Sequence, residues 1–238
     1  MPFLALLRHG QSQWNLENRF TGWVDVDLTP AGEAQAKRGG ELLAASGVAF
    51  DRLYTSVQTR AIRTGTLAIE AAGLAWLPVT KDWRLNERHY GALTGLDKAE
   101  TAKQYGDEQV KVWRRSYDVP PPPLAPGGPY DLSGDRRYAG VAIPATESLK
   151  ITLERVLPYW SATTAPDLAA GRNLIIAAHG NSLRAIVKHL FAVPDADIVH
   201  VEIPTGNPLL IELTPALAPK AARYLDESRA EALPKLPA

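Results

Sequence analysis

The sequence contains no cysteine and a single methionine in 238 residues. Disulfide bonds, thiolate metal sites and a cysteine nucleophile are therefore excluded. There is also no excess of charge of either sign, because 26 lysines and arginines balance 26 aspartates and glutamates. Proteins dedicated to nucleic-acid binding usually carry a basic excess, so this balance argues against nucleic acid as a partner.

The chain also lacks a long apolar run. The apolar residues that follow Met1 meet Arg8, which makes the run too short for a signal-peptide core or a membrane span. We therefore expect a buried strand there, and a cytoplasmic protein with no membrane partner. With 45% hydrophobic and 22% charged residues, the composition is that of an ordinary globular protein, and the length suits a single domain spanning 1–238.

Short apolar runs alternate with helical patterns along the chain. We predict strands at 3–7, 52–54, 76–79, 173–178 and 209–213. Thr29-Pro30 should open a helix that runs to about Ala45, because threonine is a good N-cap and proline is tolerated at the first helical position. Ser56 is the expected cap of the next helix, and a later helix should end near Leu190. This alternation is typical of an α/β fold with a mostly parallel sheet and helices on both faces.

Proline is concentrated in one segment, 119–129, which includes Pro120 to Pro123. That density excludes a helix or an internal strand. The segment is interpreted equally well as a surface excursion or as a loop that covers a site, because long loops in compact domains are often functional. Flanking charged and aromatic residues disfavour a proline-rich partner-binding motif. Residues 220–238 are rich in alanine, proline and charge, and we expect them to form a partly mobile tail.

Two histidine–glycine pairs follow predicted strands. His9-Gly10, preceded by Arg8, ends the first strand, and His179-Gly180 follows the strand at 173–178. Ligands of open α/β sheets bind at these carboxyl ends. Arginine offers a fixed fork to phosphate oxygens, histidine is a neutral nucleophile near physiological pH, and a helix N-terminus favours anions. The two pairs could converge on one phosphate, and the competing interpretation is a pair of satisfied core histidines.

Arg60 falls in the first turn of the helix predicted after Ser56. An arginine there is mildly unfavourable with the helix dipole, and a bound phosphate would reverse that penalty. Arg60 is therefore a candidate phosphate ligand, with a solvated surface arginine as the alternative.

Arg8-His9-Gly10, Arg60 and His179 together resemble the core of the histidine phosphatase superfamily. Longer strings resemble one branch of it, the cofactor-dependent phosphoglycerate mutases. These strings are RHGQSQWN at 8–15, FTGW at 20–23, LNERHYGALTGL at 85–96, WRR at 113–115, DRRY at 135–138 and ESL at 147–149. The likeness runs from about Leu4 to Leu213 and is weakest in the tail.

The resemblance implies an enzyme that interconverts 3-phosphoglycerate and 2-phosphoglycerate in glycolysis and gluconeogenesis. His9 would be the nucleophile and would take a phosphoryl group from 2,3-bisphosphoglycerate. Arg8, Arg60 and His179 would surround the transferring oxygens, with Asn15 donating a hydrogen bond. Phosphoryl transfer asks a protein mainly for positioning and charge stabilisation, which this set could supply.

Glu87 would be the general acid and base by the same resemblance. The alternative is that it pairs with Arg88 or Lys98 in a surface salt bridge. The family's substrate-contact positions correspond here to Ser12, Asn15, Thr21, Gly22, Tyr90, Lys98, Arg114, Arg115, Gly180 and Asn181. Of these, Lys98, Arg114 and Arg115 would hold the end of the substrate that is not transferred.

The resemblance also implies metal-independent chemistry and a homo-oligomer, either a dimer or a tetramer. Three rival interpretations stay open: a phosphatase that discharges His9 to water, a bisphosphoglycerate synthase, and a non-catalytic regulatory module on the same fold. The proline-rich segment weighs against the phosphatase, because a lid that excludes water favours transfer to a sugar acid. The retained core residues weigh against the regulatory module.

Overall fold

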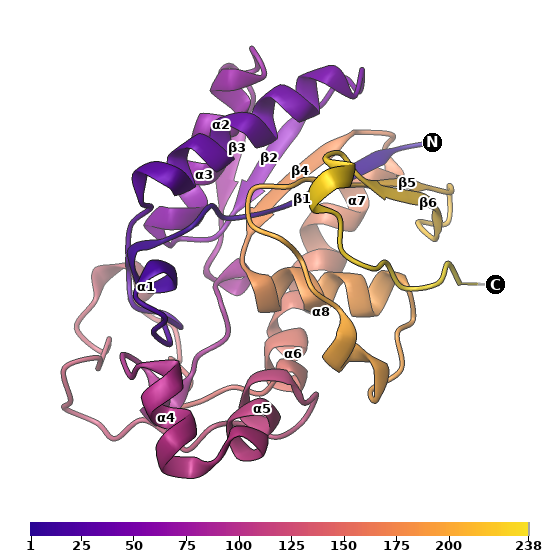
Figure 1. Cartoon of the computed structure of the whole chain (residues 1–238). Helices are drawn as coiled ribbons and strands as arrows, with labels where there is room; N and C mark the ends of the chain where they lie inside the picture. Colours follow the sequence, from indigo (N-terminus) through magenta and orange to yellow (C-terminus); the bar gives the residue numbers. More distant parts are fainter. Residues whose placement is uncertain (238) are drawn as a thin grey trace.

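A six-stranded sheet organises the chain in the computed structural model, which describes residues 1–237 (Figure 1). The strands are β1 (Phe3–Arg8), β2 (Arg52–Thr55), β3 (Val79–Lys81), β4 (Leu174–Ala178), β5 (Leu209–Leu213) and β6 (Pro219–Tyr224). Their order is β3-β2-β4-β1-β5-β6. The first four are mutually parallel, whereas β5 and β6 are antiparallel to their neighbours. The predicted α/β class with a mostly parallel sheet is confirmed.

Helices cover both faces of this sheet (Figure 1). On one face lie α2 (Pro30–Ala45) and α3 (Thr59–Ala71), and on the other α6 (Leu149–Tyr159) and α8 (Gly180–Leu190). The remaining helical elements are α1 (Gln13–Leu16), α4 (Lys98–Tyr105), α5 (Asp107–Arg115), α7 (Ala165–Ala169), a π turn at Trp160–Thr164, and short 3-10 turns at Trp83–Leu85, Gly91–Leu93, Arg136–Tyr138, Asp197–His200 and Glu227–Arg229. No helix in residues 1–237 is long and apolar enough to cross a membrane.

Alternation along β1 divides the core into two clusters. Leu4 and Leu6 pack with the residues of α6 and α8, while Ala5 packs with those of α2 and α3. Each of these side chains is fully buried. A strand buried on both faces has no position that faces water, which is why β4, and β1 as far as Leu7, are continuous apolar runs in the sequence.

The predicted start of α2 is confirmed. The hydroxyl of Thr29 accepts the Gly32 N–H at 3.1 Å, and Pro30 occupies the first helical position. The strand predicted at 76–79 is wrong, because β3 begins only at Val79 and Trp76 is 71% exposed. The chain is still turning at that point: Leu77 donates to the Leu74 carbonyl at 3.0 Å.

Ser56 does not cap α3, which corrects the second predicted cap. The N-cap is Gln58, whose side chain makes no capping hydrogen bond. Asp25 caps the helix from another segment, accepting both the N–H and the hydroxyl of Thr59 at 2.7 Å. A short-range pattern could not predict this cap, because its two partners are 34 residues apart in the sequence.

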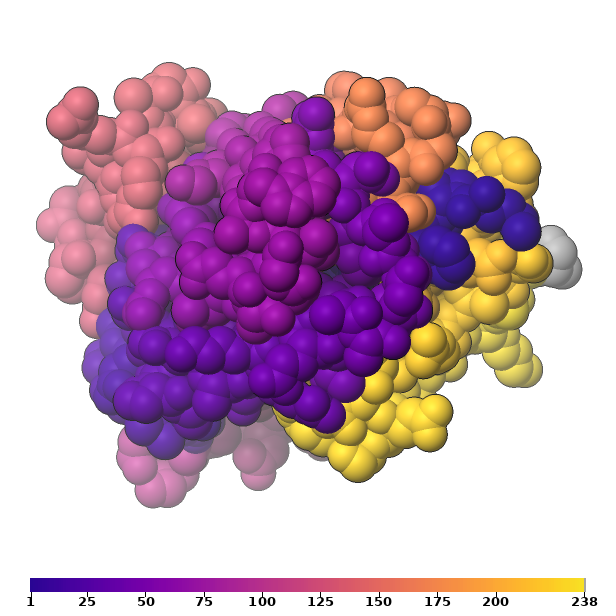
Figure 2. Space-filling model, turned by 90° about the horizontal axis from the view of Figure 1, so that it is seen from above, coloured from indigo at the N-terminus to yellow at the C-terminus, as the bar shows by residue number. Residues whose placement is uncertain are grey.

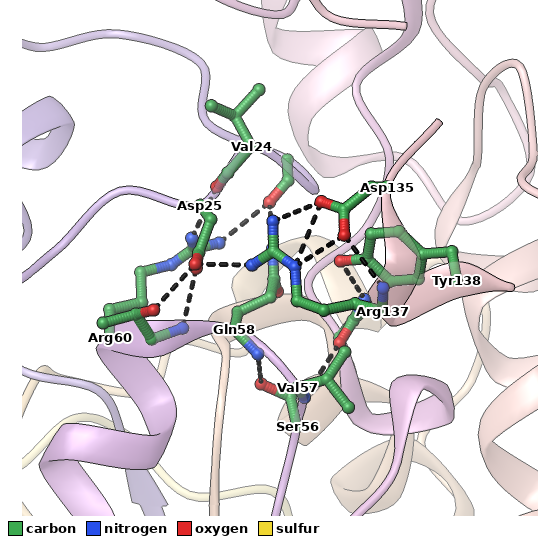
Figure 3. Close-up of polar contacts among 12 residues, drawn as sticks. Val24, Asp25, Ser56, Val57, Gln58, Arg60, Asp135, Arg137 and Tyr138 are labelled. Carbon is green, nitrogen blue, oxygen red and sulfur yellow. Dashed lines mark hydrogen bonds and ion pairs between the residues drawn. The ribbon is translucent and has the colours of Figure 1, made fainter. Parts of the chain in front are cut away.

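The segment between α5 and α6 contains the proline-rich residues 119–129, which form neither helix nor strand, as predicted. The Pro122 carbonyl accepts the Ala92 N–H at 2.8 Å, and the Pro121 carbonyl accepts the Thr146 hydroxyl at the same distance. Further along, Arg137 forms ion pairs with Asp25 and Asp135 (Figure 3). The segment projects at one side of the molecule, and the C-terminal residues lie at the opposite side (Figure 2).

Residues from 220 onward begin within β6, which pairs with β5. Leu233 packs against the core cluster on the α6 and α8 face, and Asn207 donates its side-chain N–H groups to the carbonyls of Asp226 and Arg229. Ala238 lies outside the described residues. The mobility expected for this tail stays a prediction.

Candidate active site

The sheet brings the two histidine–glycine pairs together at adjacent strand ends. In the β1–β4 register Arg8 lies opposite Ala178, and the His9 N–H donates to the Ala178 carbonyl at 2.9 Å. The imidazole rings of His9 and His179 consequently lie with their centroids 5.0 Å apart. Both rings are nearly or completely buried.

The proton of His9 is assigned by its surroundings. Nδ1 lies 2.7 Å from the carbonyl oxygen of Gly10, which can only accept, so Nδ1 carries the hydrogen. The lone pair is then on Nε2. Burial and the nearby charges of Arg60 and Arg8 lower the pKa of His9 well below its usual value. The ring is therefore a neutral nitrogen nucleophile at physiological pH.

His179 is oriented through Ser56. Nε2 of His179 lies 2.8 Å from the Ser56 hydroxyl oxygen, which also accepts the Gln58 N–H at 3.2 Å. The Ser56 hydroxyl can either donate to Nε2 or accept from it, so either ring nitrogen of His179 can carry the proton. Burial, Arg60 and His9 lower the pKa of His179 well below its usual value, so the ring is neutral. Nδ1 has no partner within residues 1–237, so the alternative of a fully satisfied core histidine is wrong for His179.

The two phosphate-ligand candidates among the arginines are partly unsatisfied. Arg8 donates through Nη1 to the Ile203 carbonyl at 2.8 Å, and Arg60 donates to the carbonyls of Gly22 and Val24 at 2.8 and 3.0 Å (Figure 3). Both Nε atoms are buried without a partner in the described part of the chain. Arg60 is only 1% exposed, so the surface-arginine alternative is wrong. Burial lowers its pKa to about 10, which leaves it charged at neutral pH.

Glu87 is buried rather than exposed at the surface, with 8% of its surface accessible. One oxygen, Oε1, accepts the Arg88 N–H at 2.7 Å, the Asn181 N–H at 3.2 Å and the Asn181 Nδ2 at 2.8 Å. Among the described residues it forms no ion pair with Arg88 or Lys98, so the salt-bridge alternative is not what the structure contains. The backbone N–H of Glu87 donates to Gln58 Oε1 at 2.9 Å, which ties the backbone of this residue to the start of α3.

The pocket is rich in positive charge, although the molecule as a whole is neutral. Its described lining includes seven cations, Arg8, Arg19, Arg60, Lys98, Arg114, Arg115 and Arg184, and two carboxylates, Glu87 and Glu202. Burial is the first cause that lowers the pKa of both Lys98 and Arg114. Clustered, half-buried cations are costly without an anion, so the lining fits a ligand that carries several negative charges.

Most predicted site residues line this pocket. They are Arg8, His9, Asn15, Thr21, Gly22, Arg60, Glu87, Tyr90, Lys98, Arg114, Arg115, Gly180 and Asn181. His179 is fully buried next to His9 and is not itself among the lining residues. Ser12 is also fully buried: its hydroxyl accepts the Asn15 N–H at 3.3 Å and its own N–H donates to Asn15 Oδ1 at 3.1 Å. Ser12 thus orients Asn15 and caps α1.

Sequence reasoning missed several lining residues, namely Arg19, Phe20, Arg184 and Glu202. A signal existed for Arg184, because it follows Gly180 by four residues and so shares its helix face. Glu202 had none: it lies in an irregular segment and enters the site through its ion pair with Arg115.

A family model of the histidine phosphatase superfamily (branch 1) matches residues 4–217. The chain therefore belongs to the histidine phosphatase superfamily. Solved structures support the fold: a mycobacterial glucosyl-3-phosphoglycerate phosphatase aligns over 94% of this chain and 97% of its own, with TM-score 0.71 and 22% identity. An alpha-ribazole phosphatase from Shigella flexneri aligns over 89% and 91%, with TM-score 0.62 and 22% identity.

Relatives of higher identity place the chain within that superfamily. A protein of Caulobacter vibrioides is 73% identical over 99% of this chain and 100% of its own, and one of Hyphomonas neptunium is 65% identical over 100% of both. A protein of Maricaulis maris is 60% identical over 100% of this chain and 99% of its own. All three are named 2,3-bisphosphoglycerate-dependent phosphoglycerate mutase. The chain belongs to this mutase family.

Proposed function

We propose that this protein interconverts 3-phosphoglycerate and 2-phosphoglycerate through a phosphorylated His9, primed by 2,3-bisphosphoglycerate. One observation supports this most strongly: a neutral histidine, with its lone pair on Nε2, lies in a pocket whose charged lining residues are mostly cations. The names of the 60–73% identical relatives support the choice of substrate.

The positive charge of the pocket matches the negative charge that such a ligand carries. Each phosphate bears roughly −1.5 to −2 charge near neutral pH, and the glycerate adds a carboxylate. Arg8 and Arg60 have buried donors free for one phosphate. Lys98, Arg114 and Arg115 line the same pocket and would hold the other end of the molecule.

Bound 2,3-bisphosphoglycerate supplies the first phosphoryl group. Nε2 of His9 attacks the phosphorus, a P–N bond forms and the P–O ester bond breaks. Glu87 delivers a proton to the departing alkoxide oxygen. In the second transfer Glu87 removes the proton from the hydroxyl of a monophosphoglycerate, a new P–O bond forms and the P–N bond breaks. Two transfers between defined partners replace one difficult intramolecular shift.

Three groups would stabilise the charge that develops during each transfer. These are the guanidinium groups of Arg8 and Arg60 and the imidazole of His179. The Nε atoms of both arginines and Nδ1 of His179 have no hydrogen-bond partner within residues 1–237. Fixed donors in a site closed to water are the main electrostatic contribution to this kind of chemistry. The segment between α5 and α6 lies against the loop that carries Tyr90, and would favour transfer to a sugar acid over transfer to water.

We also propose that the reaction needs no metal, because the arginines would supply the neutralising charge. Within residues 1–237 no cluster of three or more histidine and carboxylate side chains is placed to hold a metal ion. A cytoplasmic location, where a step of glycolysis or gluconeogenesis takes its substrate, is part of the same proposal. A homodimer or homotetramer stays a prediction, which light scattering on the purified protein tests.

The deciding experiment is turnover of 3-phosphoglycerate, coupled to enolase, with and without added 2,3-bisphosphoglycerate and with excess chelator. We expect turnover that requires the bisphosphate and is unaffected by the chelator. Release of inorganic phosphate without mutase turnover would instead identify a phosphatase. The coupling enolase needs Mg²⁺ itself, so in the chelator arm Mg²⁺ is restored before the enolase step is read. Loss of mutase turnover in that arm would contradict the metal-independent route.

A further inference from the structure

Arg184 is a buried cation in the pocket that the proposed chemistry does not use. It lies on α8, is 3% exposed, and forms no ion pair with any residue in the described part of the chain. Burial and the charges of Arg88 and Arg115 lower its pKa to about 10, so it remains charged at neutral pH among other cations. A charge held at such a cost requires a reason.

The hydrogen bonds of Arg184 indicate what this buried charge does. Nη2 donates to the Ile198 carbonyl at 2.6 Å, and Nη1 donates to Oδ1 of Asn181 at 2.9 Å. A guanidinium group can only donate, so the Asn181 atom that faces it must be the amide oxygen. The amide nitrogen of Asn181 is thereby directed to Glu87 Oε1, at 2.8 Å, and to the Tyr90 hydroxyl, at 3.2 Å.

The orientation of Asn181 determines which oxygen of Glu87 can exchange a proton. Oε1 is occupied by three N–H donors, one of them the Asn181 amide. All the hydrogen bonds of the carboxylate within residues 1–237 are made by Oε1, and none by Oε2. If the Asn181 amide turned over, its oxygen would face the carboxylate, and Oε1 would exchange a donor for a repulsive contact.

We propose that Arg184 is a positioning residue that locks the side-chain amide of Asn181, and so keeps Oε1 of Glu87 occupied and Oε2 free for the proton. Arg184 acts through Asn181 rather than as a group that reacts. This inference deepens the proposed function, on which its rate measurements rest.

Lys188 provides a matched control on the same helix. It lies one turn beyond Arg184, is 9% exposed, and also donates to a carbonyl of the neighbouring segment, Val193, at 2.6 Å. Its ion pair is with Asp195, at 2.6 Å, and it makes no hydrogen bond to Asn181. Removing Lys188 therefore loosens α8 from the same segment without freeing the amide.

The rate test is a double-mutant cycle of Arg184→Met and Asn181→Ala, with Lys188→Met as control. We expect Arg184→Met to lower kcat about 10- to 100-fold, as misplaced catalytic groups do. We expect the KM for 3-phosphoglycerate to change by less than about threefold, since a group that acts on the reacting centre changes kcat rather than uniform binding. The double variant should be no more than about twofold slower than the slower single variant, because the two residues act in series.

Arg184→Lys keeps the charge but not the fork that spans Asn181 and Ile198. Its kcat should stay low, and the same cycle can be built on it if Arg184→Met does not fold. Wild-type kcat in Arg184→Lys would overturn the inference. So would a loss confined to KM, which would make Arg184 a substrate ligand, or losses that multiply in the double variant.

A readout independent of turnover separates this inference from the proposed function. The side-chain amide resonances of Asn181 in a ¹⁵N–¹H NMR spectrum are identified by their loss in Asn181→Ala. We expect them to shift or broaden in Arg184→Met and to be unchanged in Lys188→Met. Unchanged resonances in Arg184→Met would overturn the lock. A wild-type protein without mutase turnover would refute the proposed function, and the amide resonances would still decide the role of Arg184.

Discussion

Glu87 has its two carboxylate oxygens in different situations. Oε1 accepts three N–H groups, while Oε2 is without a hydrogen bond in the described residues. A carboxylate of this kind can release and take up a proton at one oxygen without losing the contacts that hold the other. That asymmetry suits a group that must act as an acid in one transfer and as a base in the next.

Replacing Glu87 with glutamine preserves the shape of the side chain and removes the carboxyl group that would take up and release the proton. We expect Glu87→Gln to lower kcat by about 10²- to 10⁴-fold, the usual contribution of a general acid or base. Binding of 3-phosphoglycerate, measured by calorimetry, should persist because the cations of the pocket are unchanged.

The matched control is Glu202→Gln, which alters the other described carboxylate of the pocket, the partner of Arg115. It should change KM more than kcat. Near-wild-type turnover in Glu87→Gln would remove Glu87 from the chemistry.

At the level of elements, the proline-rich segment is seated on a glycine. Gly91 has φ +57°, and the Pro122 carbonyl accepts the N–H of the next residue, Ala92. A Cβ at position 91 would overlap the Pro122 oxygen and press on Thr146. Only glycine allows the segment to approach this closely, one residue from Tyr90 in the pocket wall.

Gly91→Ala should therefore displace the proline-rich segment. We expect more than the roughly 1–2 kcal/mol of stability that a left-handed conformation costs an alanine, together with faster proteolysis within 116–148 and a raised KM. Gly127→Ala is the control, because Gly127 has φ +76° but nothing within 4 Å of an added Cβ. That variant should show the backbone cost alone. Equal effects in the two variants would show that the contact with Pro122 does not hold the segment.

The elements that the sequence predicts well are those with local causes. β4 and the interior of β1 are buried on both faces and so are apolar, and the start of α2 depends on neighbours three residues apart. The cap of α3 was not predictable, because Asp25 reaches it from a separate segment. The strand placed at 76–79 failed because apolar residues there belong to a turn, which the exposed Trp76 makes clear.

The same distinction between local and long-range causes applies to the residues of the candidate site. His9 and His179 were predictable from two strand ends, because parallel strands end at one edge of the sheet. The role of Ser56 beside His179 was not, since a cap and a buried hydroxyl partner look alike in sequence. The role of Arg184 could not be predicted from the sequence, because it depends on the direction of the hydrogen bonds of this side chain, which only the folded structure shows.

Across the whole molecule, buried neutral histidines link stability to pH. Burial first, and nearby cations second, hold the pKa of His9 and His179 well below normal, and burial lowers that of His89 to about 4. In the unfolded chain each would titrate near 6.5. Below that pH the unfolded state therefore binds protons that the folded state does not, so folding is favoured less as the pH falls.

We expect the free energy of unfolding to decrease between pH 7.5 and 5, with a slope that approaches about 1.4 kcal/mol per pH unit for each such histidine. Denaturant titrations across that range measure it. His179→Gln should have a slope that is shallower by the contribution of one histidine. A stability that is flat or rises towards pH 5 would contradict the neutral histidines.

The contact between Nδ1 of His9 and the Gly10 carbonyl also has a regiochemical consequence. Of the two isomers that a phosphorylated imidazole can adopt, only the one substituted at Nε2 (the τ isomer) is compatible with this hydrogen bond. In the proposed reaction the phosphoryl group would therefore arrive at and depart from the same nitrogen, and the ring would not need to rotate between the two half-reactions. In this proposal the bisphosphate reorients within the pocket, while the imidazole ring keeps its orientation.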